Sequence, residues 1–156
     1  MTTKSQPQLT LAGAKIAIAA SEAKARSMGI DFNIAIVDAS THLLHFSRMP
    51  NAKITSISIA MDKAFTAAGH RVGTHTYKDA VWPGGVAYGL GNSNGGRFTT
   101  FGGGLPIVNS EGVVVGGIGA STGTPAQDQE VVAAGKEAVE RIMREEGDGG
   151  RVKSKL

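Results

Sequence analysis

The sequence predicts an α+β domain in which helices pack against a single antiparallel sheet. The chain has 156 residues, 41% of them hydrophobic and 19% charged, which is the size and balance of one globular domain with its own core. Helical patterns alternate with pairs of short strand patterns along the chain. The strands of each pair are close enough in sequence to form a hairpin, and hairpins build antiparallel sheets.

The first third of the chain predicts one helix and one hairpin. Apolar residues recur at helical spacing over residues 9–28, and Gly29 supplies a stop. Residues 32–37 and 42–48 have the short apolar patterns of strands, with turn residues between them.

The middle of the chain predicts a second helix over residues 54–70 and a short helical turn over 76–81. The segment 82–104 that follows is different, because it holds a large share of the glycines of the chain. Glycine permits backbone conformations with positive φ, so this segment is predicted to be a loop. Loops of this length inside a compact domain are usually functional.

The last third predicts a second hairpin, with strands at residues 105–108 and 113–118. Pro125 then opens a final helix that is expected to end near residue 146. The domain is therefore expected to span residues 1–146.

Residues 147–156 are predicted to form a flexible tail, because glycines follow the last helical pattern. The tail ends in Ser154, Lys155 and Leu156, the sequence of a peroxisomal targeting signal. We expect the peroxisomal matrix as the location and the peroxisomal import receptor as a partner. The alternative is a chance ending on a cytoplasmic protein.

Composition excludes several classes of function. The chain has no cysteine, so disulfides, thiol nucleophiles and cysteine-ligated metals are ruled out. Its net charge is +3, of which the tail carries +2, and it has one tryptophan and two tyrosines. This leaves no basic, aromatic face for nucleic acid. No apolar run is long enough to span a membrane, and the four histidines show no metal-binding spacing.

Four motifs, in order, resemble a known family. They are S-R-M-P at residues 47–50, A-M-D-K-A-F-T-A at 60–67, G-G-L-P-I at 103–107, and G-G-I-G-A-S at 116–121 followed by Asp128. The chain is similar over about residues 9–145 to the GlcG/HbpS family.

That resemblance implies a profilin-like fold, in which helices flank an antiparallel sheet of about five strands. It also implies a homo-oligomer, a dimer or an octamer, and haem as the one expected cofactor. Family members that ligate haem through histidine do so from the first helix. The first helix of this chain has no histidine.

The second helix carries the main candidate for acid–base chemistry. Ser56, Lys63, Thr66 and His70 follow one stripe of this helix, at steps of seven, three and four residues. Lys63, Thr66 and His70 are the candidate catalytic residues, and Ser56 is a candidate ligand contact, since such a face can orient an anion or pass a proton. The alternative is a solvated helix face.

Arginine and histidine side chains supply further candidate ligand contacts. Arg48 can bind a carboxylate such as a haem propionate, or it can form an ion pair with Asp38 or Asp62. His75 lies across a glycine turn from His70, so both can approach one ligand.

The glycine clusters and the start of the last helix complete the set of candidates. Arg97, Gly103 and Gly104 belong to clusters whose backbone amides can approach a ligand closely, or which simply form tight turns. Ser121 and Asp128 flank the start of the final helix, where they can cap it or contact a ligand.

Three hypotheses of function remain open. The first is an oligomeric protein that binds haem or a similar planar, anionic small molecule through Arg48, Lys63 and His70. The second is a cofactor-free isomerase, hydratase or cyclase acting on a small organic acid, with Lys63 or His70 as the acid–base group and glycine amides stabilising an enolate. The third is a structural assembly partner of another peroxisomal protein.

Overall fold

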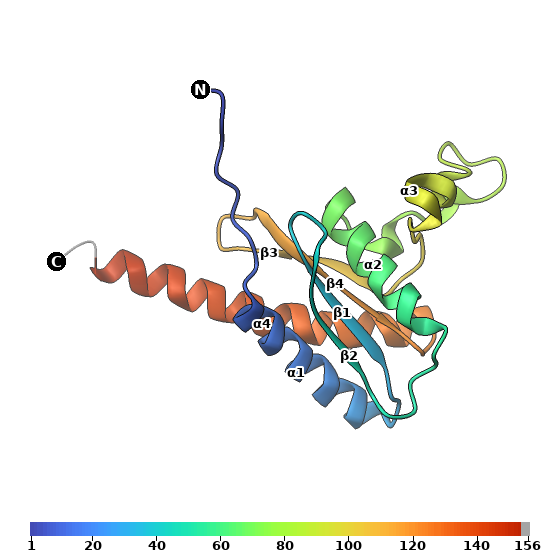
Figure 1. The fold of residues 1–156 in the computed structure, drawn as a ribbon, viewed down its shortest axis with the longest axis horizontal. Coiled ribbons are helices and arrows are strands. Elements are labelled where there is room, and N and C mark those ends of the chain that lie inside the picture. The colour runs from blue at the N-terminus through green and yellow to red at the C-terminus, as the bar shows by residue number, and fades with distance from the viewer. Residues whose placement is uncertain (154–156) are drawn as a thin grey trace.

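The structure is a computed structural model that describes residues 1–153, and the side chains of residues 1–147 (Figure 1). The expected peroxisomal signal, Ser154 to Leu156, therefore lies outside the described residues. The main helices are α1 (Leu11–Met28), α2 (Ser56–His70) and α4 (Pro125–Lys153). The strands are β1 (Asn33–Asp38), β2 (Leu43–Arg48), β3 (Gly104–Val108) and β4 (Val114–Ser121).

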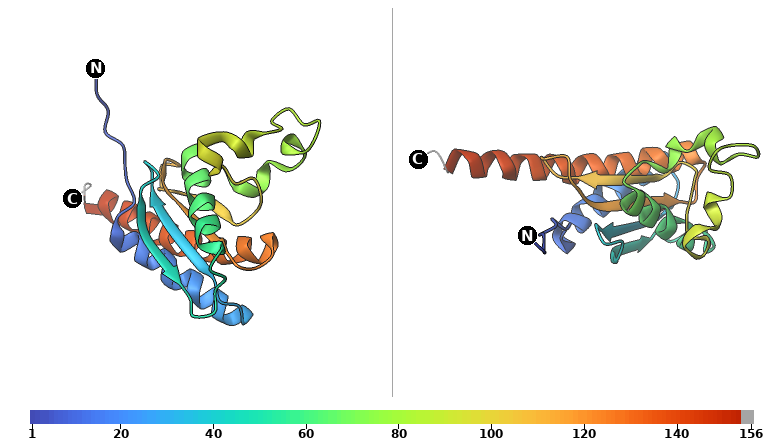
Figure 2. Two further views of the ribbon diagram at one scale, coloured as in Figure 1. Left: turned by 45° about the vertical axis from the view of Figure 1, so that its right-hand side comes forward. Right: turned by 90° about the horizontal axis from the view of Figure 1, so that it is seen from above.

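The four strands form one antiparallel sheet in the order β2-β1-β4-β3. The predicted α+β class and both predicted hairpins are confirmed, but the described residues form four strands in this sheet where the family resemblance implied about five. α1 and α4 cover one face of the sheet, and α2 covers the other (Figures 1 and 2).

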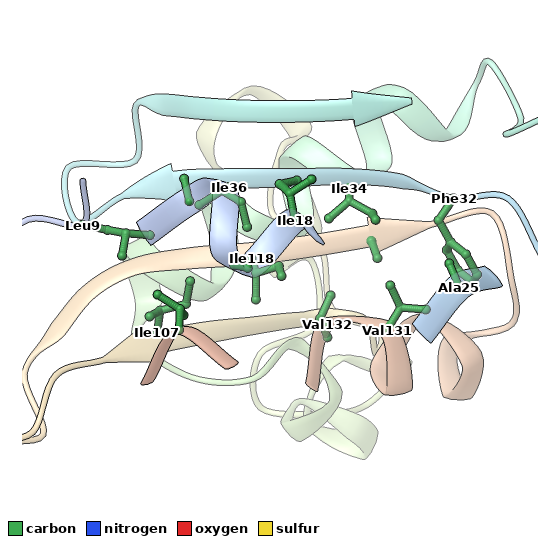
Figure 3. Packing of buried hydrophobic residues seen from close by; sticks show 14 of the residues in the cluster. Leu9, Ile18, Ala25, Phe32, Ile34, Ile36, Ile107, Ile118, Val131 and Val132 are labelled. Carbon is green, nitrogen blue, oxygen red and sulfur yellow. The ribbon is translucent and has the colours of Figure 1, made fainter. Parts of the chain in front are cut away.

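The larger core lies between the sheet and the α1–α4 layer. Figure 3 shows Ile34, Ile36 and Ile118 of the sheet pointing toward Ile18 of α1 and Val132 of α4. These five side chains are at most 5% exposed. Burying branched apolar side chains is the main stabilising contribution to such a domain.

The layer under α2 is thinner because it is built from small residues. Ala60, Ala64 and Ala68 of α2 pack on β1 and β4. The side of β4 that faces them carries Gly117 and Gly119, and a Cβ at Gly119 would lie only 2.1 Å from the carbonyl oxygen of Ala60. The backbone of α2 therefore lies very close to that of β4. A long side chain of α2 can for this reason extend beyond the sheet as far as α4.

The segment between α2 and β3 is an extended excursion at the end of the molecule where α4 begins (Figures 1 and 2). It contains three short 3-10 helices and one short α-helix: Thr74–Thr76, Lys78–Val81, Leu90–Asn92 and α3 (Ser93–Gly96). We call residues 77–102 the glycine loop. The expectation of a long loop with positive φ is confirmed at Gly84, Gly89, Gly95 and Gly96.

α4 is longer than the helical pattern predicted. It continues past Gly147 to Lys153, although glycines were expected to end it near residue 146. A glycine inside a helix costs about 1 kcal/mol and stops it only when the backbone turns left-handed. Within the described residues, no helix is long and apolar enough to cross a membrane.

Candidate functional site

Lys63 lies at the centre of the site, on the face of α2 that packs against the sheet. Its side chain has no exposed area. The Nζ atom donates to Oδ2 of Asp128 at 2.5 Å and to the carbonyl oxygen of Ala120 at 3.1 Å. It also lies 4.7 Å from the centre of the Phe101 ring, a cation–π contact. Lys63 and Asp128 form a buried ion pair that ties α2 to α4 through the end of β4.

Of the two roles expected for Asp128, capping the final helix is wrong, and contact with a ligand stays a prediction. Its Oδ1 atom accepts the backbone N–H of Gly123 at 3.0 Å, while Oδ2 binds Lys63. The hydroxyl of Thr124 accepts from the N–H of Gln127 at 3.3 Å and takes the capping position. Ser121 likewise is no cap, because it ends β4 and is buried.

Burial dominates the electrostatics of the buried ion pair. Desolvation lowers the pKa of Lys63, and its hydrogen bond and charge interaction with Asp128 oppose that change. Desolvation raises the pKa of Asp128, and Lys63 opposes it in turn. The role of Lys63 as a general base stays a prediction: as the side chain is placed, a substrate would meet Nζ only after Phe101 moved.

The glycines of the G-G-L-P-I motif make room for this pair. Gly103 has φ of +112°, and a Cβ there would lie 2.5 Å from the Asp128 Cβ and 2.7 Å from the Lys63 Nζ. The Gly103 amide donates to Oε1 of Gln129, and the Gly104 amide donates to the Thr74 hydroxyl. Both amides are therefore bonded within the protein as it is folded, and Gly104 begins strand β3, paired with Gly119 of β4.

The stripe on α2 is not a solvated face, and its side chains do not converge. Ser56, Lys63 and Thr66 are at most 6% exposed, because they lie on the side of the helix that packs against the domain. Thr66 accepts from the backbone N–H of Thr99 at 2.9 Å. His70 is exposed and its Nδ1 lies 2.6 Å from the hydroxyl of Tyr77. Lys63, Thr66 and His70 thus have three separate sets of partners.

Arg48 ends the edge strand β2 and is exposed. Neither expected ion pair forms: Asp62 binds Arg97 at 2.9 Å, and Asp38 lies beside His42. Within the described part of the chain Arg48 takes part in no ion pair, so its role as a carboxylate ligand stays a prediction.

Arg97 holds the glycine loop against α2. Besides its ion pair with Asp62, its guanidinium lies 4.0 Å from the centre of the Phe65 ring. On the same side, His70 stacks on Tyr77 and meets the edge of Phe98. Arg97 is therefore an anchor of the loop, and together with the His70 contacts it fixes the loop against α2.

Between the anchored loop and the start of α4 lies a hollow of about 370 Å³, which we call the aromatic hollow. Trp82 and Phe101 line it and remain 62% and 47% exposed. Other lining residues include His75, Lys78, Pro125 and Gln129, and within residues 1–147 no acidic side chain lines it. Phe101 separates the hollow from the buried ion pair, because its ring also contacts Lys63.

Sequence reasoning found His75 but missed Trp82, Lys78 and Phe101. The available signal was the pair of aromatic residues, Trp82 and Phe101, that bracket the glycine-rich segment. Two aromatic residues that bracket a loop can line one hollow only if the loop folds back on the domain. Whether it folds back depends on the contacts of the loop with α2.

Tyr77 offers a test of how the loop is anchored. Burial raises the pKa of Tyr77 from 10.0 to about 12. Because the folded pKa is higher, the folded chain holds more protons than the unfolded chain between these values, and stability is expected to fall as the pH rises through this window. The ultraviolet absorbance of the phenolate should show a late titration step, which a Tyr77→Phe variant should lack. If the late titration step persists in the Tyr77→Phe variant, the buried phenol is not that of Tyr77.

The four-stranded antiparallel sheet between a helix pair and a single helix defines a small α+β domain with a ligand-sized hollow at one end. The sequence model of the family Haem degrading protein HbpS-like matches residues 9–137, and the chain belongs to this family. The family predicted from the four motifs is therefore confirmed.

Individual relatives agree with this assignment. An uncharacterized 15.0 kDa protein of Citrobacter freundii from the dhaT-dhaS intergenic region is 43% identical over 78% of this chain and 84% of its own length. The structure of Klebsiella pneumoniae protein ORFY is 36% identical and superposes with a TM-score of 0.85 over 89% of this chain and 96% of that one. A PduOC–haem complex is 31% identical with a TM-score of 0.80, over 84% and 94% of the two chains.

Proposed function

We propose that this protein binds haem, or a similar planar and anionic small molecule, in the aromatic hollow. The observation that carries the proposal is a pair of exposed aromatic rings, Trp82 and Phe101, in a hollow that no acidic residue lines in the part of the chain that the structure describes. The family description and the haem complex of the PduOC relative support the same ligand class.

The chemistry of the lining residues fits such a ligand. Indole and phenyl faces pack on a flat conjugated ring system. The volume of about 370 Å³ falls within the range of about 300–1,000 Å³ that is common for small-molecule sites. A porphyrin carries carboxylates at one edge, and the ammonium of Lys78 is the cation on the lining that can meet them.

The backbone of Lys78 supports a role at the rim. Its φ is +40°, a left-handed conformation that costs a non-glycine residue about 1–3 kcal/mol and is concentrated at functional sites. Lys78 is also exposed, so a bound carboxylate would bring it a partner without the cost of burying the free ammonium.

The oligomer belongs to the same proposal. Trp82 lines the aromatic hollow and is exposed, and we propose that a second copy of the chain covers this side when a ligand is bound. The peroxisomal matrix and the import receptor stay predictions from Ser154, Lys155 and Leu156; the relatives named above are bacterial.

Titration with hemin, followed by the Soret band, tests the proposal. We expect a saturable Soret shift for the wild-type protein and binding weaker on the order of tenfold for Trp82→Ala, because one face of the hollow is lost. Tyr88→Ala is the matched control, since Tyr88 is 67% exposed in the same loop but does not line the hollow. A flat wild-type titration, or equal losses in both variants, would contradict the proposal.

A further inference from the structure

His75 is set apart from the other three histidines by its place in the fold. It lines the aromatic hollow, whereas His42 and His45 belong to the β1–β2 hairpin and β2. His70 lies near the hollow but is occupied, because its Nδ1 meets the Tyr77 hydroxyl and its ring is stacked. An exposed imidazole beside two exposed aromatic rings has no structural role in the core.

The backbone that carries His75 is held firmly. Thr74, its neighbour, is fully buried and its hydroxyl accepts from the N–H of Gly104 at 2.9 Å. Thr76, on the other side, donates its N–H to the carbonyl oxygen of Gly73 at 3.0 Å, and its hydroxyl donates to the same oxygen at 2.8 Å. A side chain that binds a metal needs such a fixed backbone, because a mobile side chain does not keep the geometry that ligation requires.

The ring of His75 rests on Gly73. A Cβ at Gly73 would lie 2.5 Å from the Cε1 and 2.7 Å from the Nδ1 of the imidazole. A side chain at this position would collide with the ring as it is placed, so glycine makes room for the imidazole. Neither ring nitrogen has a hydrogen-bond partner among the side chains that the structure describes, so a nitrogen lone pair of the neutral imidazole is free to bind.

The side chains that line the hollow include one that is suited to bind iron. Imidazole is a common axial ligand of haem, along with thiolate, thioether and phenolate. The chain has no cysteine. Among the residues that the structure describes, the lining of the hollow contains neither methionine nor tyrosine, which leaves His75 as the one residue of these types there.

We propose that a ring nitrogen of His75 binds the iron of a haem held in the aromatic hollow. The inference rests on the proposed function for the presence of haem. It assigns to this chain, whose first helix has no histidine, an iron ligand on the turn between α2 and the glycine loop.

Two porphyrins separate iron ligation from the fit of the ring. The purified full chain is titrated with hemin and with metal-free protoporphyrin, as wild type, His75→Ala and the control His42→Ala, whose side chain is 82% exposed in the β1–β2 hairpin away from the glycine loop. For His75→Ala we expect hemin affinity to fall by about tenfold or more, equivalent to about 1.4 kcal/mol per tenfold. Protoporphyrin affinity should stay within about twofold of wild type, because the rings that hold the macrocycle are unchanged.

Spectra of the ferric complex give a second readout. His75→Ala should lose the Soret position and spin state of the wild-type complex, and free imidazole should restore them, while His42→Ala should keep them. If His75→Ala keeps the affinity and the spectra of the wild type, His75 is not the iron ligand. The same conclusion follows if Lys78→Ala loses them and His75→Ala does not. In both cases the proposal that the protein binds hemin would stand. Failure of the wild-type protein to bind either porphyrin would instead overturn the proposed function.

Discussion

Replacing Lys63 with methionine is expected to lower the free energy of unfolding by about 3–5 kcal/mol. The substitution keeps most of the volume of the side chain but leaves the carboxylate of Asp128 buried without its cation. Asp128 is 2% exposed, so water cannot replace the lost partner without opening the domain. Urea unfolding followed by circular dichroism measures the change as a shift in midpoint at constant slope.

The double variant Lys63→Met with Asp128→Asn is the control for this prediction. Asparagine keeps an oxygen for the N–H of Gly123 but removes the charge. We expect the double variant to recover most of the stability lost in the single variant, because a buried pair is costly mainly when one charge is left alone. If the single and double variants are equally destabilised, packing around Lys63 and not charge pairing dominates.

The pH dependence of the buried pair has a defined sign. Because burial lowers the pKa of Lys63, the unfolded chain holds more protons between that lowered pKa and 10.5, and stability should rise with pH there. Because burial raises the pKa of Asp128, the folded chain holds more protons between 3.8 and that raised pKa, and stability should fall as pH rises there. The double variant, Lys63→Met with Asp128→Asn, should lose both of these pH-dependent contributions to stability.

Gly119→Ala is expected to lower the free energy of unfolding by about 3 kcal/mol, the upper end of the usual cost of overpacking. The added Cβ would lie 2.1 Å from the carbonyl oxygen of Ala60 and 2.5 Å from the amide nitrogen of Ala64. Both are backbone atoms of α2, so no side-chain rotation relieves the contact and the whole helix must move away from β4. Chemical unfolding of the variant measures the loss.

Gly91→Ala is the matched control for this second prediction. A Cβ at Gly91 would lie 3.7 Å from its nearest contact, the carbonyl oxygen of Phe98, which is ordinary packing distance. We expect a change of no more than about 0.5 kcal/mol. A Gly119→Ala variant as stable as Gly91→Ala would show that α2 does not lie on β4 at this distance.

Helical and strand periodicity predicted the order of the main elements because those patterns are local. The helix of residues 9–28 and both hairpins follow from the spacing of apolar side chains over a few turns or residues. The end of α4 was predicted poorly, since glycine propensity alone does not decide where a helix stops.

The candidate site was harder to predict than the fold. Ser56, Lys63 and Thr66 of the stripe are buried together whereas His70 is exposed. The sequence did not predict this difference, because periodicity cannot say whether a helix face meets water or the sheet. Lys63 lies in the layer where Gly117 and Gly119 bring the helix close to β4. A lysine among alanines then became buried, and its partner is 65 residues away in sequence.

By itself the sequence determined the α+β class, the family and the residue types available for chemistry, including the absence of cysteine. Tertiary structure alone decided that Asp128 binds Lys63 and does not cap α4, and that Trp82, Phe101 and His75 line one hollow. The physical reason is the separation in sequence over which each kind of interaction acts. Propensity and periodicity act between near neighbours, whereas ion pairs and hollows depend on how the helices, the sheet and the glycine loop pack together.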